Sequence, residues 1–522
     1  MSVLSWLVGR LLHLLPAKFP SVAVERDVEV EMRDCVRLLA DRWHAPAAGD
    51  APVILVRTPY GRGGPFALIY RLFAERGFQV VVQACRGTGG SGGQFDPMRQ
   101  EAADGLDTLA WVKAQPWAEG RRLFTYGSSY VGFTQWAIAE QTGVTIDGML
   151  LHVTLSNFRD ETLAGGGFTL EGSLGWTMLI KSMAKGAGLR GGKLPPDVFS
   201  LLPLGDLDRR GAGETVSWWQ DWVGHPDLDD PWWQAVDHSA KAARIEAPVA
   251  MVAGWRDIFL PTQLADFTAM RAAGAEAWLT VGPWTHAAPA GFGESIRQAI
   301  ALFGSGAEGM TERVRLYLQG ADEWRSYDSW PPEGGAELQL HLQPDGPTRY
   351  VYDPADPTPS LHGARLSGGK GPPDMSPIEA RRDTISFTGS KLDSTLDIIG
   401  PVQATVSVRC DREHFDLFLI VCDVDERGRP LHVSDGYVRI GPGLFPPNAD
   451  GVREVALSCW PTAYRVKAGH RIRLIVASGA HPRYARNLGT GDPLATATSM
   501  VPATIEVFPG LALSLTVAPS AS

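Results

Sequence analysis

Five short apolar runs without polar alternation limit most strongly how this 522-residue chain can fold. They are PVILVRTPYG, FQVVVQACRG, LFTYG, APVAMVAGW and AWLTVGPW, at residues 52–61, 78–87, 123–127, 247–255 and 277–284. Helix-like segments separate the first three runs. Continuous apolar strands that alternate with helices are typical of a parallel sheet buried on both faces. The pattern therefore predicts an α/β core.

Two other stretches differ from these runs in composition and in the spacing of their apolar residues. Residues 157–244 are rich in Gly, Leu and Trp with helical spacing, which predicts an inserted helical cap. After residue 308, alternating segments separated by Pro/Gly/Asp turns are typical of a jelly-roll β-sandwich. We therefore predict a core in two parts, residues 1–156 and 245–307, with the cap at 157–244 and a C-terminal jelly roll at 308–522.

The N-terminal stretch MSVLSWLVGRLLHLLP does not fit a signal peptide, because no basic residues precede its apolar run and no small-residue cleavage site follows. It is also too short to span a bilayer, so stable membrane insertion is not expected. One helical face carries Leu4, Leu7, Leu11, Leu12 and Leu15. This spacing predicts an amphipathic helix packed on the body of the protein or on a partner, with contact to a membrane surface as the alternative.

Charge and cysteine content exclude several classes of function. The net charge is −10 and no basic stripe is present, which argues against a nucleic-acid partner. The cysteines are few, odd in number and scattered, which indicates free thiols in a reducing compartment, the bacterial cytoplasm; they are Cys35, Cys85, Cys410, Cys422 and Cys459. The sequence has no HExxH motif and no Cys/His cluster, so we expect neither a metal nor a cofactor.

The segment RGTGGSGG, residues 86–93, contains the glycine spacing of a dinucleotide-binding loop, with Asp107 twenty residues beyond Gly87. Such a loop has to open a helix directly, so that phosphate meets the N–H groups of the helix N-terminus. Here residues 94–97 intervene before a helix can start. We therefore predict a tight structural loop.

The segment TYGSSYVGF, residues 125–133, has the context of a nucleophile elbow, in which a serine sits on a cramped turn between a strand and a helix. An apolar run precedes Gly127, and a helix-like run follows Tyr130. The spacing departs from G-x-S-x-G, because Gly132 comes one position late for Ser129. Taken alone, the segment is a weak signal and fits a serine-rich turn better than a nucleophile elbow.

A nucleophilic serine needs a base and an acid that orients the base. In α/β-hydrolases these residues follow in the order Ser, Asp, His, each just past a strand. Asp257 and His286 each lie two residues beyond the end of an apolar run, in that order. His152 also lies near a strand end, but it precedes Asp257. The order predicts Ser129, Asp257 and His286 as a catalytic triad on an α/β-hydrolase core.

Acyl transfer also needs donors for the developing oxyanion. The backbone N–H of Tyr130, directly after the predicted nucleophile, is one candidate. The second is the hydroxyl of Tyr60 in the segment RTPYG, where Pro59 stiffens the loop.

The segments RTPYG, CRGTGGSGGQF, GSSYVGFTQW, GWRDIF and GPWTH together resemble the CocE/NonD hydrolases, the cocaine esterase and X-Pro dipeptidyl-peptidase superfamily, over nearly the whole chain. The segment HPRYARNLGTGD, residues 481–492, is similar to the Arg-Asn-x-x-Thr-Gly turn of that family. Its elbow reads Gly-x-Ser-Tyr-x-Gly, which implies Ser129 as nucleophile and Ser128 as a variable position. The resemblance further implies Asp257, His286, the two oxyanion donors, a helical cap and a jelly roll.

Two positions depart from the family pattern. Ala84 stands where the family usually has Asp, and Cys35 stands where it usually has Gly. Neither position belongs to the triad, so the departures concern local loop structure.

The resemblance also implies an acyl pocket lined by Trp176 and Phe259, although a second tryptophan of the relatives is missing near Glu161. We expect a carboxylesterase acting on small esters. The alternative is an X-Pro dipeptidyl aminopeptidase or α-amino-acid ester hydrolase, which needs carboxylates for the ammonium of its substrate, and Asp160, Glu161 and Glu171 are candidates. A second alternative is a non-catalytic binding protein built on the jelly roll. The sequence leaves assembly into a homo-oligomer open.

Overall fold

The computed structural model describes residues 3–140, 144–186, 194–366 and 373–518, which form two compact units. Unit 1 comprises Met1–Phe158, Met183–Gly188 and Trp233–Arg315. Unit 2 comprises Arg159–Ser182, Leu189–Trp232 and Leu316–Ser522. Residues predicted as the cap therefore belong mainly to unit 2, together with the C-terminal β-domain.

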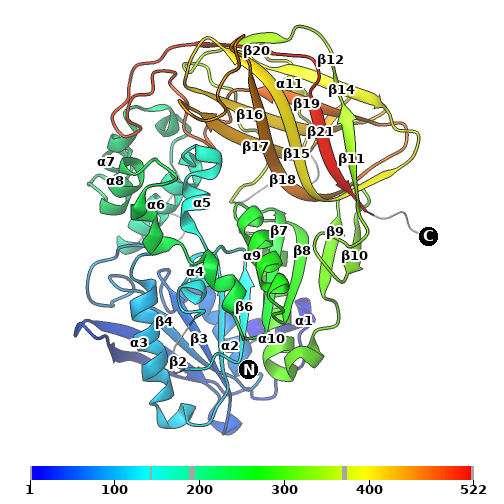
Figure 1. Cartoon of the computed structure of the whole chain (residues 1–522). Coiled ribbons are helices and arrows are strands. Elements are labelled where there is room, and N and C mark those ends of the chain that lie inside the picture. The colour runs from blue at the N-terminus through cyan, green and yellow to red at the C-terminus, as the bar shows by residue number, and fades with distance from the viewer. Residues whose placement is uncertain (1–2, 141–143, 187–193, 367–372, 519–522) are drawn as a thin grey trace. The chain divides into compact units, whose positions relative to one another are not determined.

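Unit 1 is built around a mixed sheet whose strands β1 to β8 lie in the order β1-β2-β4-β3-β5-β6-β7-β8. Figure 1 labels β2, β3, β4, β6, β7 and β8 of this sheet. All neighbours from β4 to β8 are parallel. The parallel strands are β3 (Val53–Thr58), β4 (Gln79–Ala84), β5 (Leu123–Ser128), β6 (Gly148–His152), β7 (Val249–Arg256) and β8 (Ala277–Thr285). Their residues are almost all buried, as the apolar runs predict. The chain leaves unit 1 along β9 (Val314–Leu318), and β10 (Glu323–Tyr327) follows.

Helices cover the sheet of unit 1. They are α2 (Ala67–Ala74), α3 (Glu101–Lys113), α4 (Tyr130–Ala137), α9 (Leu260–Ala272) and α10 (Pro289–Ser305). One apolar core joins alternate strand residues to α2 and α10. Phe124 of β5, for example, stacks on Phe303 of α10 with ring centroids 4.5 Å apart. Strand β6 was not among the five predicted runs, because its five residues are followed directly by further apolar residues and no turn signal marks its end.

Strands β1 (Ala23–Glu31) and β2 (Arg37–His44) form an antiparallel hairpin. Met32 N–H donates to Val36 O, and Cys35 N–H donates to Met32 O. Cys35 lies in the left-handed region at φ 64°. Left-handed backbone is costly for a residue with a Cβ, so this position favours glycine over Cys35.

The N-terminal helix α1 (Val3–Leu11) is present, but it does not pack through its leucine-rich face. Ser5 and Gly9 are buried, and Val8 and Leu12 pack against the core of unit 1. The exposed side chains on the other side are Leu4, Leu7, Leu11 and Leu15, with Val3 and Trp6. Of the predicted leucine face, only Leu12 packs on the body, because the small residues Ser5 and Gly9 on the opposite face permit a closer approach. Packing of the exposed leucines on a partner, or their contact with a membrane surface, stays a prediction.

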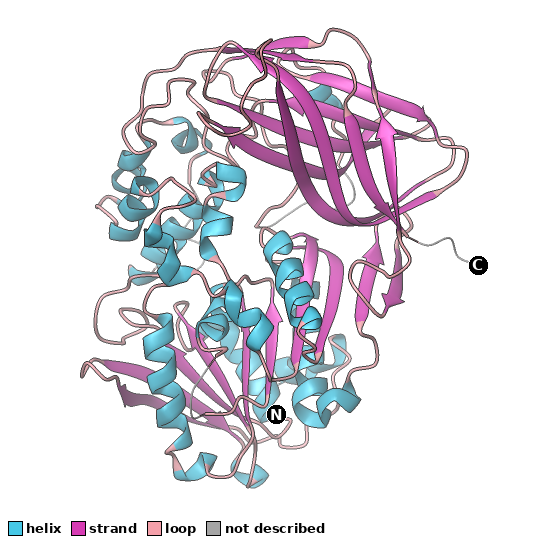
Figure 2. Ribbon diagram, in the orientation of Figure 1, coloured by secondary structure: helices cyan, strands magenta, loops and turns pink. Residues whose placement is uncertain are grey.

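The β-domain of unit 2 contains two sheets, whose strands Figure 2 shows in magenta. One sheet has the order β11-β21-β15-β20-β13, with β18 also paired to β15, and the other has the order β12-β14-β19-β16-β17. The strands are β11 (Ala336–His341), β12 (Gln343–Pro344), β13 (Arg349–Tyr352), β14 (Ile385–Lys391), β15 (Leu396–Cys410), β16 (Phe415–Val424), β17 (Pro430–Ile440), β18 (Arg453–Val466), β19 (Arg471–Ala477), β20 (Ala503–Val507) and β21 (Ala512–Val517). A short helix, α11 (Ser376–Glu379), precedes β14.

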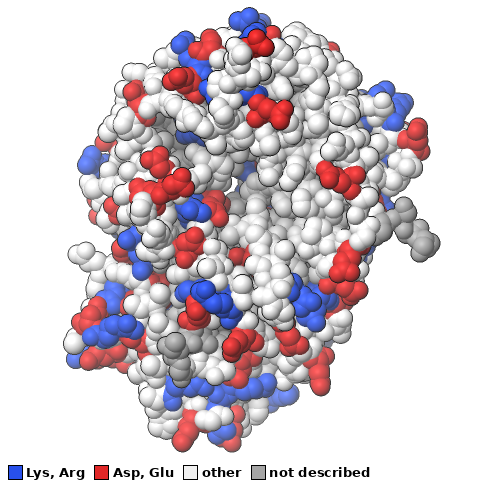
Figure 3. Space-filling view, in the orientation of Figure 1, with Lys and Arg blue, Asp and Glu red and all other residues white. Residues whose placement is uncertain are grey.

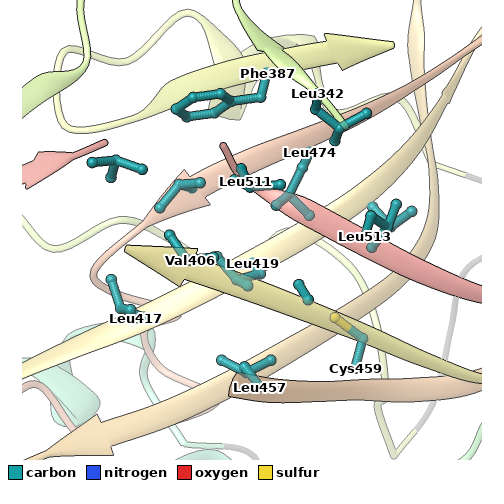
Figure 4. Packing of buried hydrophobic residues seen from close by; sticks show 14 of the residues in the cluster. Leu342, Phe387, Val406, Leu417, Leu419, Leu457, Cys459, Leu474, Leu511 and Leu513 are labelled. Carbon is teal, nitrogen blue, oxygen red and sulfur yellow. The ribbon is translucent and has the colours of Figure 1, made fainter. Parts of the chain in front are cut away.

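Apolar side chains from both sheets form the core of the β-domain. Figure 4 shows this packing around Val406, Leu419, Leu474 and Leu513, all of which are at most 1% exposed. Alternate residues of β20 and β21 point into the core, as expected for strands with one buried face. This is the two-sheet arrangement predicted for the C-terminal part.

The remaining helices lie in the inserted segment, mostly in unit 2. They are α5 (Phe158–Thr162), α6 (Leu170–Ala184), α7 (Leu207–Ala212) and α8 (Ser217–Gly224). The inserted segment has a core rich in tryptophan, because Trp218, Trp219 and Trp222 of α8 are all buried. Among the residues that the structure describes, none of the helices has the length and apolar character that crossing a bilayer requires.

Acidic and basic side chains are interspersed over the face drawn in Figure 3. A mixed surface of this kind, together with a net charge of −10, favours solvation rather than binding to a polyanion.

Candidate active site

The turn between β5 and α4 holds Ser129 in the left-handed region, at φ 59° and ψ −129°. Its N–H donates to the carbonyl oxygens of His152 and Val153, and its own carbonyl accepts from Gly132 N–H. These bonds fix a conformation that a serine adopts only at a cost. The backbone is that of a nucleophile elbow, and it presents the side chain at the C-terminal end of the sheet.

The two glycines around the elbow are explained by packing. A Cβ on Gly127 would lie 2.3 Å from Val131 O, and a Cβ on Gly132 would lie 2.4 Å from Thr154 Cβ. Both positions therefore require glycine because of close neighbours. The close approach to the chain segment after β6 falls at position 132, which accounts for the late second glycine.

Three predicted residues meet beyond the ends of three different strands. Ser129 follows β5, Asp257 follows β7 and His286 follows β8, each directly after the last strand residue. The distance from Ser129 Oγ to His286 Nε2 is 2.9 Å, and the distance from His286 Nδ1 to Asp257 Oδ2 is 2.7 Å. Parallel strands bring distant parts of the chain together at one edge of a sheet in this way.

The surroundings of this trio determine what it can do. Asp257 is fully buried and also accepts a hydrogen bond from Phe259 N–H, so its carboxylate is fixed in place. With Nδ1–H donating to Asp257, Nε2 of His286 is left to accept the Ser129 proton. The ring of Phe259 lies edge-on to the imidazole, with centroids 5.0 Å apart. The arrangement suits removal of the Ser129 proton and stabilisation of the resulting imidazolium.

Ser128, the other serine of the turn, lies outside this trio. Its Oγ is 2.7 Å from Nδ1 of His152, which is 1% exposed at the end of β6. Burial, and secondarily the nearby His286, lowers the pKa of His152 to about 3. His152 is therefore a neutral hydrogen-bond partner that holds the side chain of Ser128, the residue before Ser129. Sequence reasoning set His152 aside for its order in the chain and did not assign it this structural role.

A buried ionic group lies under the first turn of α4, and sequence reasoning missed it. Tyr130 Oη donates to Glu101 Oε1 at 2.7 Å and accepts from Met98 N–H. Glu101 Oε2 is 2.9 Å from Nη2 of Arg57, and both residues are 2% exposed. The arginine inside the apolar run VILVRT is the signal that could have revealed this group, because a buried cation needs a partner.

The predicted oxyanion donors lie at the same edge of the sheet as Ser129. Tyr130 is the first residue of α4, so its amide belongs to the positive end of that helix. Tyr60 lies in the loop after β3, the neighbour of β5, and its N–H donates to Thr58 Oγ1 at 3.0 Å. Its ring contacts Phe66, with centroids 6.3 Å apart.

The two predicted pocket residues have different surroundings. Phe259 contacts His286, as described above. Trp176 belongs to α6 in unit 2, where its ring lies 5.9 Å from that of Trp222 and 6.5 Å from that of Trp218. Trp176 is thus part of an aromatic cluster with α8, and its assignment to the acyl pocket stays a prediction.

The glycine-rich segment forms a tight loop. Gly87 N–H donates to Gly92 O, and a Cβ on Gly87 would lie 2.3 Å from Phe95 N. Helix α3 begins only at Glu101. Asp107, the residue that would bind a ribose in a dinucleotide site, forms an ion pair with Arg33 at 2.8 Å. The loop therefore connects β4 to α3 and has a structural role, as predicted.

Comparison with known proteins agrees with this geometry. Residues 34–288 match the X-Pro dipeptidyl-peptidase family (S15 family), and residues 306–507 match the X-Pro dipeptidyl-peptidase C-terminal non-catalytic domain. The sequence is 31% identical to a cocaine esterase of Rhodococcus sp. (strain MB1 Bresler), over 91% of this chain and 94% of that protein. The chain belongs to the CocE/NonD hydrolase family.

Solved structures share the fold of this CocE/NonD chain. An aminopeptidase from the marine sediment archaeon Thaumarchaeota archaeon superposes with a TM-score of 0.79 at 20% identity, over 96% of this chain and 98% of the other. An α-amino acid ester hydrolase superposes with a TM-score of 0.78 at 20% identity, over 97% and 98%. The CocE/NonD chain is a hydrolytic enzyme, which removes the alternative of a non-catalytic jelly-roll protein.

Proposed function

We propose that this enzyme is a carboxylesterase that cleaves small esters through an acyl-enzyme on Ser129. The observation that carries the proposal is the continuous chain from Ser129 Oγ through His286 to Asp257, with distances of 2.9 and 2.7 Å. The 31% identity to a cocaine esterase supports an ester as the substrate.

In the proposed reaction, His286 Nε2 takes the Ser129 proton as Oγ attacks the ester carbonyl. Asp257 stabilises the imidazolium that forms. His286 then gives the proton to the leaving alkoxide, which departs as the alcohol and leaves an acyl group on Oγ. Water, deprotonated by the same imidazole, attacks the acyl-enzyme. The imidazolium returns that proton to Ser129 Oγ as the bond to the acyl carbon breaks, which releases the carboxylic acid and free Ser129.

The oxyanion of each tetrahedral intermediate is proposed to accept from the Tyr130 amide and the Tyr60 hydroxyl. The Glu101–Tyr130 hydrogen bond supports this role for the amide, since it anchors the side chain of the residue whose N–H has to be aimed. A preorganised donor of this kind is worth about 2.7–4 kcal/mol in the transition state.

The two serines of the turn give a matched pair of variants for testing the proposal. Ser129→Ala should lower kcat for p-nitrophenyl butyrate by roughly 10⁴-fold or more, because the nucleophile is lost. Ser128→Ala removes a hydrogen bond to His152 and should retain at least about a tenth of the activity, because its hydroxyl does not contact His286.

Labelling locates the nucleophile independently. A fluorophosphonate should modify Ser129 in the wild type and in Ser128→Ala, as read by peptide mass spectrometry. Activity that survives in Ser129→Ala, or a label found on another residue, would contradict the proposal.

The second candidate is an aminopeptidase or amino-acid ester hydrolase, because the S15 family matches residues 34–288. Such an enzyme needs free carboxylates for a substrate ammonium. Of the three predicted carboxylates, Asp160 forms an ion pair with Arg159 at 3.0 Å, which weighs against its availability. Free-amine and N-blocked Ala-Pro chromogenic substrates separate the candidates, because only an aminopeptidase discriminates strongly between them.

A further inference from the structure

Unit 2 contains a cavity of about 570 Å³. Every residue that lines it belongs to unit 2, whereas Ser129, Asp257 and His286 all belong to unit 1. Sites for small molecules typically have volumes of about 300–1,000 Å³ and combine apolar walls with a few fixed polar groups. The lining of this cavity has both properties.

One part of the lining is apolar and comes mainly from the helical segment of unit 2. It includes Leu163, Phe168, Leu170, Phe199, Leu204 and Leu488. Phe168 is held edge-on against Trp219, with ring centroids 5.6 Å apart. This wall is therefore preformed and suits an apolar body.

The other part is polar and comes from the end of β17 and from loops of the β-domain. Arg439 donates through Nε and Nη2 to the buried carboxylate of Asp416, at 3.0 and 2.9 Å. Nη2 also donates to Ala485 O and Tyr437 Oη. Within the described part of the chain, Nη1 of Arg439 has no hydrogen-bond partner. The guanidinium is thus fixed on one side and has one NH₂ group still able to donate.

Arg486 is a second cation on the cavity wall, and it differs from Arg439 in its partners. It donates only to two carbonyl oxygens, Pro354 O at 3.2 Å and Ser200 O at 2.7 Å. Among the described residues it has no carboxylate partner, and its Nε makes no hydrogen bond. Partial burial lowers the pKa of Arg486. A desolvated cation without a counter-charge is stabilised by an anion that binds beside it.

His414 adds a third polar group and is held by its neighbours. A Cβ on Gly491 would lie 2.4 Å from His414 Nε2, so only glycine permits this close contact. Gly441 lies on the other side, and its added Cβ would be 3.6 Å from Nδ1. Neither ring nitrogen has a hydrogen-bond partner among the residues that the structure describes.

The charges around the cavity limit the anion that fits. Asp227 and Asp492 also line it, and both are exposed. Asp416 already balances the charge of Arg439, so Arg486 is the remaining source of positive charge. The two aspartates partly offset that charge, and the net positive charge of the lining is therefore small. A phosphate dianion would be repelled by the two aspartates, whereas a single carboxylate can use the directional N–H donors.

We propose that this cavity is a second ligand site, which binds an organic monocarboxylate with an apolar body. The carboxylate lies between Arg486, Arg439 Nη1 and His414, and the apolar body lies against the leucine and phenylalanine wall. The products of ester hydrolysis are acids of this chemical class, so an acid product of the enzyme could occupy the site.

Octanoate is the probe, titrated calorimetrically into the full-length protein. We expect saturable binding of one octanoate per chain. Octanol, which lacks the charge, and acetate, which lacks the apolar body, should each bind at least tenfold more weakly. Equal binding of octanol would overturn the proposed carboxylate recognition.

Two variants test the location. Arg486→Met removes the unpaired cation, and Gly441→Leu places a side chain beside His414 while leaving Arg486 intact. Each should weaken octanoate binding at least tenfold, while Arg427→Met, an exposed arginine outside the cavity, should have no effect. Circular dichroism shows whether each variant is folded. If Arg486→Met does not fold, octanoate binding by Gly441→Leu alone tests the location of the site. Unchanged binding in the folded variants would overturn the proposal.

The triad is the other place where octanoate could bind, so the titration is repeated after fluorophosphonate has modified Ser129. Retained binding supports the unit 2 site, and binding lost only on modification overturns it. A failure of the reagent to label Ser129 would count against the proposed function and not against this cavity.

Discussion

Ser128 and Ser129 are neighbours in the sequence, yet their hydroxyls have different histidines as partners. Ser129 Oγ contacts His286 near the molecular surface, and Ser128 Oγ contacts the buried His152. At the scale of single residues, the turn thus places one hydroxyl beside His286 and the other beside the buried His152. The difference arises from the left-handed backbone at Ser129, which turns successive side chains to opposite sides.

The buried state of His152 makes the stability of the protein depend on pH. Its pKa of about 3 lies below the ordinary value of 6.5, so the unfolded chain takes up a proton that the folded chain does not. Folded stability is therefore present above pH 6.5 and is lost as the pH falls toward 3. Between pH 7 and pH 5 this one residue should cost about 2 kcal/mol.

Urea unfolding of His152→Gln at the two pH values tests this expectation. The variant should lose about 2 kcal/mol less than the wild type between pH 7 and pH 5. His341→Gln, at an exposed histidine, is the control. An equal loss in wild type and His152→Gln would contradict the expectation.

Cys35 gives a second prediction at the residue scale. Because φ is 64° at the last residue of a hairpin turn, Cys35→Gly relieves a left-handed strain but adds freedom to the unfolded chain. The strain is the larger effect, so the variant should be more stable by up to about 1 kcal/mol. Thermal unfolding measures this, and a lower Tm would show that the thiol makes compensating contacts.

The proximity of Ser129, Asp257 and His286 could be predicted, because each one directly follows a strand and the three come in a fixed chain order. Their catalytic roles stay a prediction. The supporting residues Arg57, Glu101 and His152 were not predicted, because their partners lie 24 to 44 positions away in the sequence and nothing local pairs them. The late glycine was unexplained by local turn chemistry alone. Its reason is the contact of Gly132 with Thr154 in the chain segment after β6.

At the scale of elements, helix α1 shows the limit of periodicity. The pattern predicted a helix correctly but not its buried face, because two small residues, Ser5 and Gly9, allow a closer fit than the leucines do. Ser5 Oγ also donates to Glu75 at 2.9 Å, a contact that no hydrophobic pattern encodes.

Substitutions on α1 and in the turn that follows it can check which side chains are buried. Leu7→Gln and Leu11→Gln change side chains that are 52% and 76% exposed, so each should alter the free energy of unfolding by less than about 0.5 kcal/mol. Leu12→Ala removes a side chain packed on the core of unit 1 and should cost about 1 kcal/mol or more. Chemical denaturation compares the three, and a larger cost for Leu7→Gln than for Leu12→Ala would contradict the observed packing.

At the scale of the whole molecule, each of the two units has its own apolar core. Only one of them, unit 1, contains Ser129, Asp257 and His286. The division into a parallel sheet and an all-β domain followed from strand patterns, since the period of hydrophobicity differs between the two. The predicted domain boundaries at 157, 245 and 308 remain proposals.

Leu474→Ala tests the independence of the two cores. Leu474 is fully buried in the β-domain, so the substitution should destabilise unit 2 by about 2–5 kcal/mol. Fluorophosphonate titration at low temperature counts the sites that remain intact. The turnover of p-nitrophenyl butyrate per intact site should stay within about twofold of the wild type. A proportional loss of turnover would show that the chemistry depends on the packing of unit 2.

The hairpin turn between β1 and β2 has a practical consequence. Cys35 is exposed, whereas burial raises the thiol pKa of Cys85, Cys422 and Cys459 and raises that of half-buried Cys410 to about 11. At neutral pH a maleimide dye should therefore attach at Cys35 before any other thiol. Cys35 therefore offers one thiol at which a fluorophore can be attached or the protein immobilised on a surface. Apart from Tyr60, the residues of the proposed reaction are distant from Cys35 in the sequence.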